Sequence, residues 1–214
     1  AGSAQNSITS LQKADSIHCY GSEFDVWLAK DNKLVVNHDP VYKMKYMEYS
    51  KGDALTGLKL SNGENLPSLQ KYLEAGKKCN TKLKAHNSKK RETKAVQEIL
   101  AMVKKMGLED RMEYITFSLH AMKEFIRLAP AGTPVFYLNG ELSPKELKDL
   151  GAAGLDYHMG VIKKHPEWIK EAHDLGLKVN VWTVDKAEDM KWLIDQKVDF
   201  ITTNEPIVAQ DMLK

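Results

Sequence analysis

The 214-residue chain is 43% hydrophobic, which is enough to bury one sizeable core, so we expect a single domain spanning residues 1–214. Its 31 basic and 29 acidic residues leave a formal net charge of +2, and no basic run is interleaved with aromatic residues, which argues against a nucleic-acid partner. No apolar run reaches the roughly 18 residues of a membrane-spanning helix. The chain starts without a charged and then an apolar segment, so we expect that any signal peptide has been removed or never existed. Two cysteines, Cys19 and Cys79, are too few for a disulfide framework. We therefore expect a soluble, globular, single-domain protein.

Short apolar runs alternate with amphipathic stretches from one end of the chain to the other. A first helix is expected at about residues 6–19, without a strand before it. The expected strands are, in chain order, residues 22–28, 33–37, 81–84, 114–117, 134–138, 154–157, 178–184 and 199–202. Strands that alternate with helices indicate βαβ units and a parallel sheet.

Three of the intervening helices carry boundary signals. The sequence Ser-Pro-Lys-Glu at 143–146 combines an N-cap, a first-turn proline and a capping-box glutamate. Asp185 and Glu188 predict a second capping box. The helix that starts near Arg91 has apolar residues at i, i+3, i+4 and i+7, and Gly107 is expected to end it.

These elements fit a closed barrel better than an open sheet. Counting the hairpin at 22–37 as one position gives about seven strand positions, whereas a TIM-type barrel has eight, and an N-terminal strand is the one that is absent. An open, doubly wound sheet would alternate in the same way, but no Gly-rich phosphate loop follows the first strand. We therefore predict an α/β fold, a TIM-type (β/α)8 barrel in which the first strand and part of the third strand are missing from the chain.

Residues 40–66 form the longest connection without a strong periodicity, and they include the run YKMKYMEYS. In a barrel this connection would lie over the carboxyl-terminal face as a lid-like insertion, because lids and substrate loops occur there. A disordered excursion is the alternative interpretation.

The stretch SEFDVWL places two carboxylates within an apolar strand. Glu23 and Asp25 are two residues apart, so a strand would point both to one side while Phe24 and Val26 face the other. Two ionised carboxylates in a barrel lumen repel each other and lose hydration unless a cation is present. Hard oxygen ligands suit Mg²⁺ or Ca²⁺ rather than zinc. A half-exposed strand with a polar face is the alternative, but the apolar neighbours and the nearby His38 favour a metal site.

Four further residues are candidates because of where the expected strands end. His38 closes the run LVVNHD and could act as a general acid. Lys84 ends the short third strand and could bind a phosphate as a point charge. Trp182 and Asn204 lie at or just after the ends of later strands, on the face where barrel enzymes build their sites, although Trp182 could equally be core packing.

The order of these segments resembles that of the glycerophosphodiester phosphodiesterases. The motifs EFDV, VVNHD and NLPSLQKYLEAG, a strand ending in lysine, VNVWTV and FITTNEP follow one another as in that family, over most of the chain. The resemblance implies a TIM-type barrel that hydrolyses a glycerophosphodiester of lipid metabolism, such as glycerophosphocholine or glycerophosphoethanolamine, to glycerol phosphate and an alcohol. It also implies one divalent cation, Mg²⁺ or Ca²⁺, as the cofactor and a small-molecule phosphodiester as the substrate.

Carried over residue by residue, the resemblance implies roles for five residues. Glu23 and Asp25 match two metal ligands, and His38 matches the histidine that protonates the leaving alcohol. Lys84 matches the lysine of a Glu-x-Lys motif near the phosphate, and Trp182 matches the tryptophan that lines the glycerol side. The implied reaction combines charge neutralisation by the metal with acid–base catalysis: a glycerol hydroxyl attacks the phosphorus, and water opens the resulting cyclic phosphate.

Two segments depart from the family pattern. The family begins with a strand ending His-Arg-Gly, which supplies a second catalytic histidine and a phosphate-binding arginine, whereas this chain begins AGSAQNS. In NTKLKAH, Lys82 falls on the position of the glutamate that is the third metal ligand, and a lysine cannot bind the cation. We expect one block of residues to be missing before Gly2 and another between Leu83 and Lys84. The alternative is a chain that has lost both sites and kept the scaffold.

Other functions stay open. A phospholipase D-like phosphodiesterase acting on lysolipid or sphingolipid headgroups would have an apolar mouth and bind membranes, whereas YKMKYMEYS is mixed in polarity. A catalytically inactive barrel would bind phosphodiesters or a protein partner. An unrelated barrel could carry EFDV and HD by chance, but the later WTV and ITTNEP motifs disfavour it. The sequence leaves the oligomeric state unknown, and its trimmed start favours a periplasmic or secreted location over a cytoplasmic one.

Overall fold

The structure, a computed structural model, describes residues 3–79, 82–87 and 91–214, and for residues 82–87 it describes the backbone alone. It forms two compact units, each of which is described by itself. The amino-terminal unit comprises residues 3–114 and 127–133, and the carboxy-terminal unit comprises residues 115–126 and 134–214. The division falls within β6 (Met112–Thr116) and within α5 (Leu119–Leu128).

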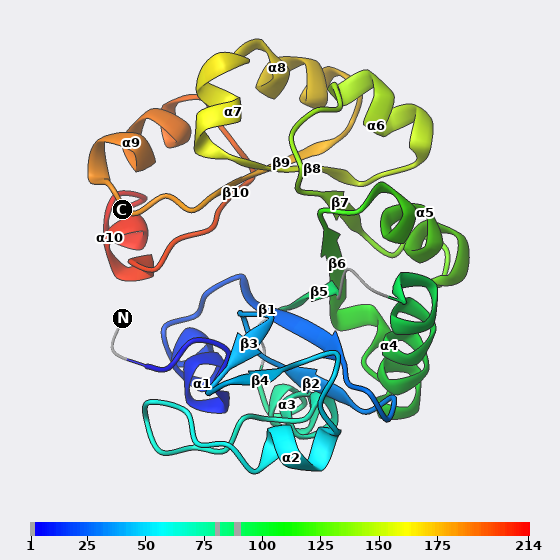
Figure 1. The fold of residues 1–214 in the computed structure, drawn as a ribbon. Helices are drawn as coiled ribbons and strands as arrows, with labels where there is room; N and C mark the ends of the chain where they lie inside the picture. Colours follow the sequence, from blue (N-terminus) through cyan, green and yellow to red (C-terminus); the bar gives the residue numbers. More distant parts are fainter. Residues whose placement is uncertain (1–2, 80–81, 88–90) are drawn as a thin grey trace. The chain divides into compact units, whose positions relative to one another are not determined.

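The amino-terminal unit begins with a helix, continues with four strands and two helices, and ends with a strand followed by helices (Figure 1). Its central strand, β1, is parallel to β5 on one side and antiparallel to β2 on the other, and β3 pairs with β4 in a separate hairpin. The elements of this unit are α1 (Ile8–Ser16), β1 (Gly21–Leu28), β2 (Leu34–Val36), β3 (Val41–Tyr42), β4 (Lys45–Tyr46), α2 (Gly52–Thr56), α3 (Leu69–Gly76), β5 (Lys82–Asn87), α4 (Glu92–Met106) and a 3₁₀ helix (Glu109–Arg111). The α1 helix, β1 and β2 lie where the sequence predicts them.

The long connection at 40–66 is a folded segment rather than a disordered excursion. It contains β3, β4 and α2, and an isolated β-bridge pairs Lys59 with Asn65. Apolar side chains from this connection are buried together with one residue each from the start of the chain, the turn after β1 and β2; the cluster comprises Ala4, Ala29, Val35, Met47, Leu55, Leu60 and Leu66. The predicted lid-like role of the segment stays a prediction.

Strand β5 is longer than the sequence predicts. Its six residues, Lys82–Asn87, pair with β1 without interruption through Leu83 and Lys84, whereas the apolar pattern predicted a four-residue strand that starts at Thr81. The difference arises because backbone pairing with a long neighbour, rather than side-chain apolarity, sets the length of a strand. Thr81 and the expected gap before Gly2 lie outside the described residues.

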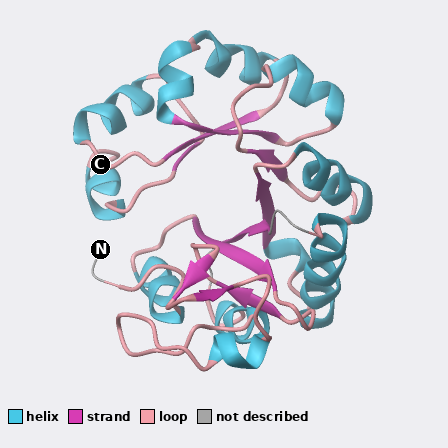
Figure 2. Ribbon diagram, viewed as in Figure 1, coloured by secondary structure: helices cyan, strands magenta, loops and turns pink. Residues whose placement is uncertain are grey.

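The carboxy-terminal unit repeats a strand–helix pattern. Strands β7, β8, β9 and β10 pair in parallel in that order. The elements are β7 (Val135–Tyr137), α6 (Pro144–Leu150), β8 (Gly154–His158), α7 (Met159–Lys164), α8 (Glu167–Asp174), β9 (Lys178–Trp182), α9 (Ala187–Asp195), β10 (Phe200–Ile201) and α10 (Pro206–Asp211). Figure 2 shows the helices of this unit on one face of its strands. A doubly wound sheet carries helices on both faces, so this arrangement is that of a barrel.

Two of the three predicted helix boundaries are confirmed. The Ser143 hydroxyl accepts the Glu146 N–H while the Glu146 carboxylate accepts the Ser143 N–H, which is the predicted capping box. Helix α4 ends at Gly107, whose φ of +65° suits glycine. The capping box predicted for Asp185 is wrong, because α9 starts after Lys186 and has no side-chain cap.

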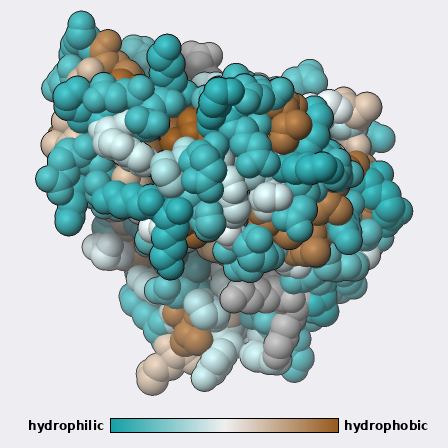
Figure 3. Space-filling view, turned by 90° about the horizontal axis from the view of Figure 1, so that it is seen from above, coloured by the Kyte–Doolittle hydropathy of each residue, from teal (hydrophilic) through white to brown (hydrophobic). Residues whose placement is uncertain are grey.

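The surface carries little continuous apolar area on the face drawn in Figure 3, where hydrophilic residues predominate and apolar residues form small separate patches. Across the described part of the chain, no helix has both the length and the apolar content needed to span a bilayer.

Asp199 joins three groups of the carboxy-terminal unit at the start of β10. Its carboxylate accepts hydrogen bonds from Lys178 Nζ at 2.7 Å, from the Val179 N–H at 2.9 Å and from His173 Nε2 at 2.9 Å. Burial raises the pKa of this carboxyl, but the hydrogen bonds together outweigh burial and hold the pKa below its ordinary value.

We expect Asp199→Asn to lower the free energy of unfolding by about 2 kcal/mol at pH 7, because hydrogen bonds to a charged carboxylate are lost. The pKa of Asp199 in the folded protein lies below its value of about 3.9 in the unfolded chain. The stabilisation by the Asp199 carboxylate is therefore fully present above pH 3.9 and is lost as the pH falls through the pKa of the folded protein. Urea unfolding at pH 7 and pH 3 should therefore show a smaller difference at pH 3. Asp195→Asn, which removes only an exposed contact with Lys191, is the control and should change stability by less than about 1 kcal/mol. A difference for Asp199→Asn that is equal at both pH values would contradict the assignment.

Candidate active site

Strand β1 separates an apolar face from a polar one. Phe24 and Val26 are buried, and the Phe24 ring centroid lies 4.4 Å from that of Tyr72 in α3. Glu23 and Asp25 occupy the alternate positions and share the other face, where Glu23 is half-buried and Asp25 is 8% exposed. The alternation therefore follows the prediction, and the role of the two carboxylates as metal ligands stays a prediction.

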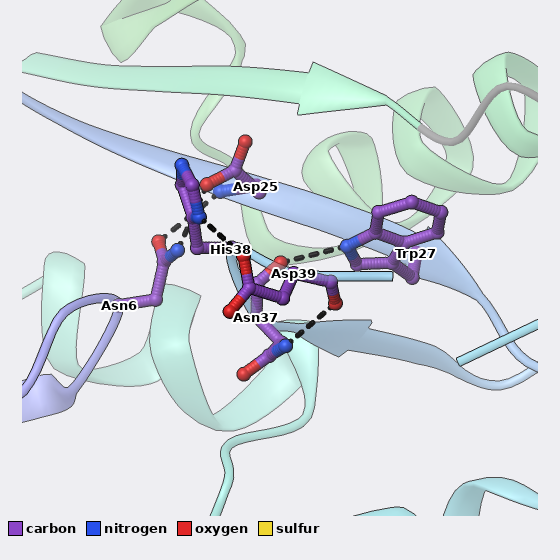
Figure 4. A network of polar contacts seen from close by, with 6 residues as sticks. All are labelled: Asn6, Asp25, Trp27, Asn37, His38 and Asp39. Carbon is purple, nitrogen blue, oxygen red and sulfur yellow. Dashed lines mark hydrogen bonds and ion pairs between the residues drawn. The ribbon is translucent and has the colours of Figure 1, made fainter. Parts of the chain in front are cut away.

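Asn6 holds Asp25 through two hydrogen bonds. Asn6 Nδ2 donates to Asp25 Oδ2 at 2.9 Å, and the Asp25 backbone N–H donates to Asn6 Oδ1 at 3.1 Å (Figure 4). Asn6 is buried and has a φ of +60°, a conformation that asparagine tolerates better than most residues. The next residue, Ser7, caps α1 by accepting the Ser10 N–H at 3.0 Å. The start of α1 is thus fixed to β1, and the Asp25 carboxylate is oriented by a neutral amide.

His38 is the first residue beyond β2 whose side chain is reactive. Its Nδ1 lies 2.9 Å from Asp39 Oδ1, and the ring is about half exposed. Because a carboxylate only accepts hydrogen bonds, Nδ1 carries the proton in this pair, and Nε2 is the nitrogen left to exchange a proton with a substrate. The contact with Asp39 thereby sets which ring nitrogen of His38 carries the proton.

Asn37 fixes the segment that carries His38. Its backbone N–H donates to the Asp25 carbonyl at 3.1 Å, which extends the β1–β2 pairing by one residue. Its carbonyl accepts Trp27 Nε1–H at 2.7 Å, and its side-chain Nδ2 donates to the Asp39 carbonyl at 2.7 Å. The antiparallel pairing of β1 and β2 therefore brings Asp25 and His38, which are 13 positions apart, to neighbouring points (Figure 4).

Lys84 occupies the β5 position opposite Glu23, and Lys82 stands opposite Gly21. The side chain of Lys84 lies outside the described residues, so its predicted contact with a phosphate stays a prediction. The register nevertheless places the backbone of Lys84 beside the first of the two carboxylates.

The chemistry of Glu23 and Asp25 fits a hard divalent cation. Mg²⁺ is commonly bound through one or two carboxylates, with water and substrate phosphate oxygens completing its shell, and Ca²⁺ also takes carboxylate oxygens. Among the side chains that the structure describes, no group of three or more His, Cys, Asp or Glu residues could hold a metal ion. The described part of the chain thus offers two candidate carboxylate ligands, Glu23 and Asp25.

Trp182 lies in the carboxy-terminal unit, at the end of β9. Its Nε1–H donates to the Asp156 carbonyl at 2.8 Å, and its ring meets those of Phe117 and His158 edge-on, with centroids 5.6 and 5.2 Å away. It also packs against Ile115, Phe136 and Leu138, so it is partly a core residue, as the alternative interpretation had it. His158 was not among the predicted site residues.

Asn204 is held by Asp185 in the same unit. The Asp185 carboxylate accepts the Asn204 N–H at 2.8 Å, Asn204 Nδ2 at 3.0 Å and Thr203 Oγ1 at 3.0 Å. Burial raises the pKa of Asp185, but these hydrogen bonds outweigh it and lower the pKa below its ordinary value. Asp185 therefore fixes the ITTNEP turn instead of capping α9, which explains why the predicted capping box is wrong.

Sequence reasoning missed Asn6, Asn37 and Asp39. Asp39 directly follows His38, so the His-Asp pair itself was the available signal. Asn6 sits in AQNS, a segment that was interpreted only as the start of a helix. Its bond to Asp25 joins residues 19 positions apart, a distance over which local patterns carry no information.

Parallel strands in sequence order with helices along one face are typical of the class of TIM-type barrel enzymes. The chain belongs to the glycerophosphodiester phosphodiesterase family: the model of the "Glycerophosphoryl diester phosphodiesterase family" matches residues 2–208. It is therefore a phosphoric diester hydrolase with a TIM-type barrel fold, as the sequence predicts.

Individual relatives agree with this assignment. The crystal structure of a glycerophosphodiester phosphodiesterase from Parabacteroides distasonis is similar with a TM-score of 0.96 and 49% identity, covering 99% of this chain and 91% of that one. A glycerophosphodiester phosphodiesterase of Caldanaerobacter subterraneus subsp. tengcongensis is 26% identical, covering 94% of this chain and 89% of that protein. A phosphodiesterase from Oleispira antarctica, solved in complex with the product sn-glycerol-3-phosphate, shares the fold with a TM-score of 0.86 at 19% identity, covering 100% of this chain and 93% of that one.

We expect Asn6→Gly to lower the free energy of unfolding by about 1–3 kcal/mol, because it removes both hydrogen bonds to Asp25 and leaves a buried acceptor and donor without them. Glycine tolerates the φ of +60°, so this variant isolates the side chain. Asn6→Ala should cost about 1 kcal/mol more, since it adds backbone strain. Lys197→Gly, at another position with a φ of +60°, is the control and should not destabilise. Urea unfolding measures all three, and an Asn6→Gly variant as stable as the wild type would contradict the role of Asn6.

Proposed function

We propose that this chain hydrolyses glycerophosphodiesters to glycerol phosphate and an alcohol in a reaction that depends on one divalent cation. The observation that carries the proposal is the pair Glu23 and Asp25 on one face of β1, next to His38 at the end of the strand paired with it. The membership of the chain in the family supports the reaction class. The complex of the Oleispira antarctica relative with sn-glycerol-3-phosphate supports glycerol phosphate as the product.

Glu23 and Asp25 are the residues that would hold the cation, Mg²⁺ or Ca²⁺. A bound divalent cation supplies charge neutralisation for the phosphodiester. The protein's own contribution is to keep both carboxylates on one side of β1 and to fix Asp25 through Asn6. Asp25 is thereby oriented before any ligand binds.

His38 would give a proton to the oxygen of the departing alcohol. Its Nδ1–H is engaged by Asp39, so the proton is delivered from Nε2. The half-exposed position of the ring allows an exchange of protons with water after each turnover. Lys84, as a point charge for the phosphate, and Trp182, as an apolar surface for glycerol, remain the proposed substrate-binding residues.

A catalytically inactive barrel that binds phosphodiesters is the second candidate. One observation favours it: Lys82, which pairs with Gly21 in the register of β1 and β5, falls on the position where the family pattern has a glutamate. Such a protein would bind glycerophosphodiesters without turnover at any concentration of a divalent cation.

We expect His38→Ala to lower kcat by about 10²–10⁴-fold, because the leaving alkoxide loses its proton donor. The affinity for the cation should stay within about twofold of the wild type, since His38 is not a proposed ligand. The rate is measured as the release of choline from glycerophosphocholine. His165→Ala, an exposed histidine stacked on Trp168 in the carboxy-terminal unit, is the control and should leave kcat unchanged. Full activity of the His38→Ala variant would mean that another group protonates the leaving alcohol.

Glu23→Gln tests the metal role separately. We expect the concentration of Mg²⁺ or Ca²⁺ needed for half-maximal activity to rise about tenfold or more, because one of two carboxylate ligands becomes neutral. Activity should recover partly at high cation concentration. Glu74→Gln, an exposed glutamate of α3 that bonds Gln70, is the matched control. An activity loss that no cation concentration reverses would assign Glu23 a structural role.

A further inference from the structure

The β3–β4 hairpin ends in an exposed tip of mixed apolar and basic character. We define the hairpin tip by six residues, Val41, Lys43, Met44, Lys45, Tyr46 and Tyr49. Met44 is 94% exposed, which is the largest exposed fraction among the large hydrophobic residues that the structure describes. Tyr46 and Tyr49 are 57% and 59% exposed, and their rings lie edge to face with centroids 6.0 Å apart. Four of the large exposed hydrophobic residues of the described chain thus gather in nine consecutive positions.

The turn of the hairpin is held in an uncommon backbone conformation. Val41 pairs with Tyr46 and Tyr42 with Lys45, so Lys43 and Met44 form a two-residue loop. Both have positive φ values, +46° and +60°, in a turn that normally takes asparagine and glycine. Residues with side chains persist in this conformation only where the surrounding structure imposes it, and such positions concentrate at functional surfaces.

The base of the hairpin is packed into the core and hydrogen-bonded to it. Met47 is fully buried in the core cluster of the amino-terminal unit, and its N–H donates to the Pro40 carbonyl at 2.9 Å. The Tyr42 hydroxyl donates to the Lys59 carbonyl at 3.1 Å. A buried base and an exposed Met44 within four residues mean that the exposure of the tip is a property of the fold rather than of a loose loop.

The charge around the tip is positive. Residues 40–51 contain three lysines and one glutamate. Lys43 and Lys45 flank Met44 and are exposed, and Lys43 Nζ lies 5.6 Å from the ring centroid of Tyr42. The nearest preceding acidic residue, Asp39, lies four positions before Lys43, and its carboxylate contacts His38. The tip therefore suits a negatively charged partner.

We propose that the hairpin tip docks on the surface of an anionic phospholipid bilayer. Met44 enters the apolar region below the headgroups, Tyr46 and Tyr49 lie at headgroup level, and Lys43 and Lys45 bind lipid phosphates. The shape of the tip favours a bilayer over a protein: a stable protein interface buries about 800 Å² on each partner, whereas this tip is a single protruding turn. Tyrosine is also enriched where membrane proteins meet the headgroup layer, and this tip places tyrosines and lysines beside an exposed apolar residue.

This inference goes beyond the proposed reaction. Glycerophosphodiesters carry no acyl chains, so their hydrolysis does not itself require contact with a bilayer. Docking would keep the protein at the surface from which deacylated lipids are released, and the class of reaction that supplies its substrate would be phospholipid deacylation.

The test is sedimentation of the full chain with vesicles of phosphatidylcholine containing about a third phosphatidylglycerol, compared with vesicles of phosphatidylcholine alone. We expect binding to the anionic vesicles that weakens as salt is added. Met44→Gly removes the apolar side chain and suits the positive φ, so it should fold, and it should lower the partition coefficient roughly tenfold. Lys43→Gln with Lys45→Gln should lower it by a similar factor.

The control removes the same charge elsewhere on the amino-terminal unit. Lys77 and Lys78 are exposed residues that follow α3, and Lys77→Gln with Lys78→Gln should change vesicle binding less than about twofold. Equal vesicle binding by the wild type and all tip variants, or no binding by the wild type at low salt, would overturn the proposal.

Turnover separates this inference from the proposed function. Met44→Gly should hydrolyse soluble glycerophosphocholine at the wild-type rate while losing vesicle binding. A loss of turnover in Met44→Gly would assign the tip to the substrate site and overturn the docking role. A wild-type protein without turnover would contradict the proposed reaction, whereas the docking proposal would still be decided by vesicle binding.

Discussion

The two-residue period of β1 is the constraint on which the candidate site depends. One face of the strand is committed to the core, because Phe24 packs against Tyr72 of α3. The other face then carries Glu23 and Asp25 together, since their side chains cannot be separated without turning the apolar residues outward. A shift of one residue in the pairing of β1 would reverse both faces at once. The same packing that stabilises the amino-terminal unit therefore places its carboxylates.

Much of the fold follows from local patterns. The apolar runs predict β1, β2, β8 and β9 because a buried strand and its side-chain composition coincide there. The β3–β4 hairpin was not predicted, since its turn residues, Lys43 and Met44, lack the Asn-Gly signal. The length of β5 was underestimated because pairing with β1 continues past the apolar residues. Strand existence is a local property, whereas strand extent depends on the neighbour.

The candidate site divides in the same way. Glu23, Asp25 and His38 could be named from the sequence because a strand rarely carries such residues among apolar neighbours. The roles of Asn6 and Asp185 could not be named from the sequence, since both act through distant hydrogen bonds. Asn6 bonds a residue 19 positions away, and Asp185 bonds residues 18 and 19 positions away. Asp185 resembles a helix cap in sequence, yet its carboxylate accepts three hydrogen bonds from the ITTNEP turn instead of capping α9. Residues that act over such distances along the chain leave no pattern of their own in the sequence.

We propose that the carboxylates of β1 serve a divalent cation in phosphodiester hydrolysis. The most direct measurement is the release of glycerol phosphate from glycerophosphocholine by protein first treated with a chelator and then titrated with Mg²⁺ or Ca²⁺. We expect no turnover after chelation and a rate that rises and saturates as the cation is restored. Turnover that chelation leaves unchanged, or no turnover at any concentration of either cation, would rule out this role of the carboxylates.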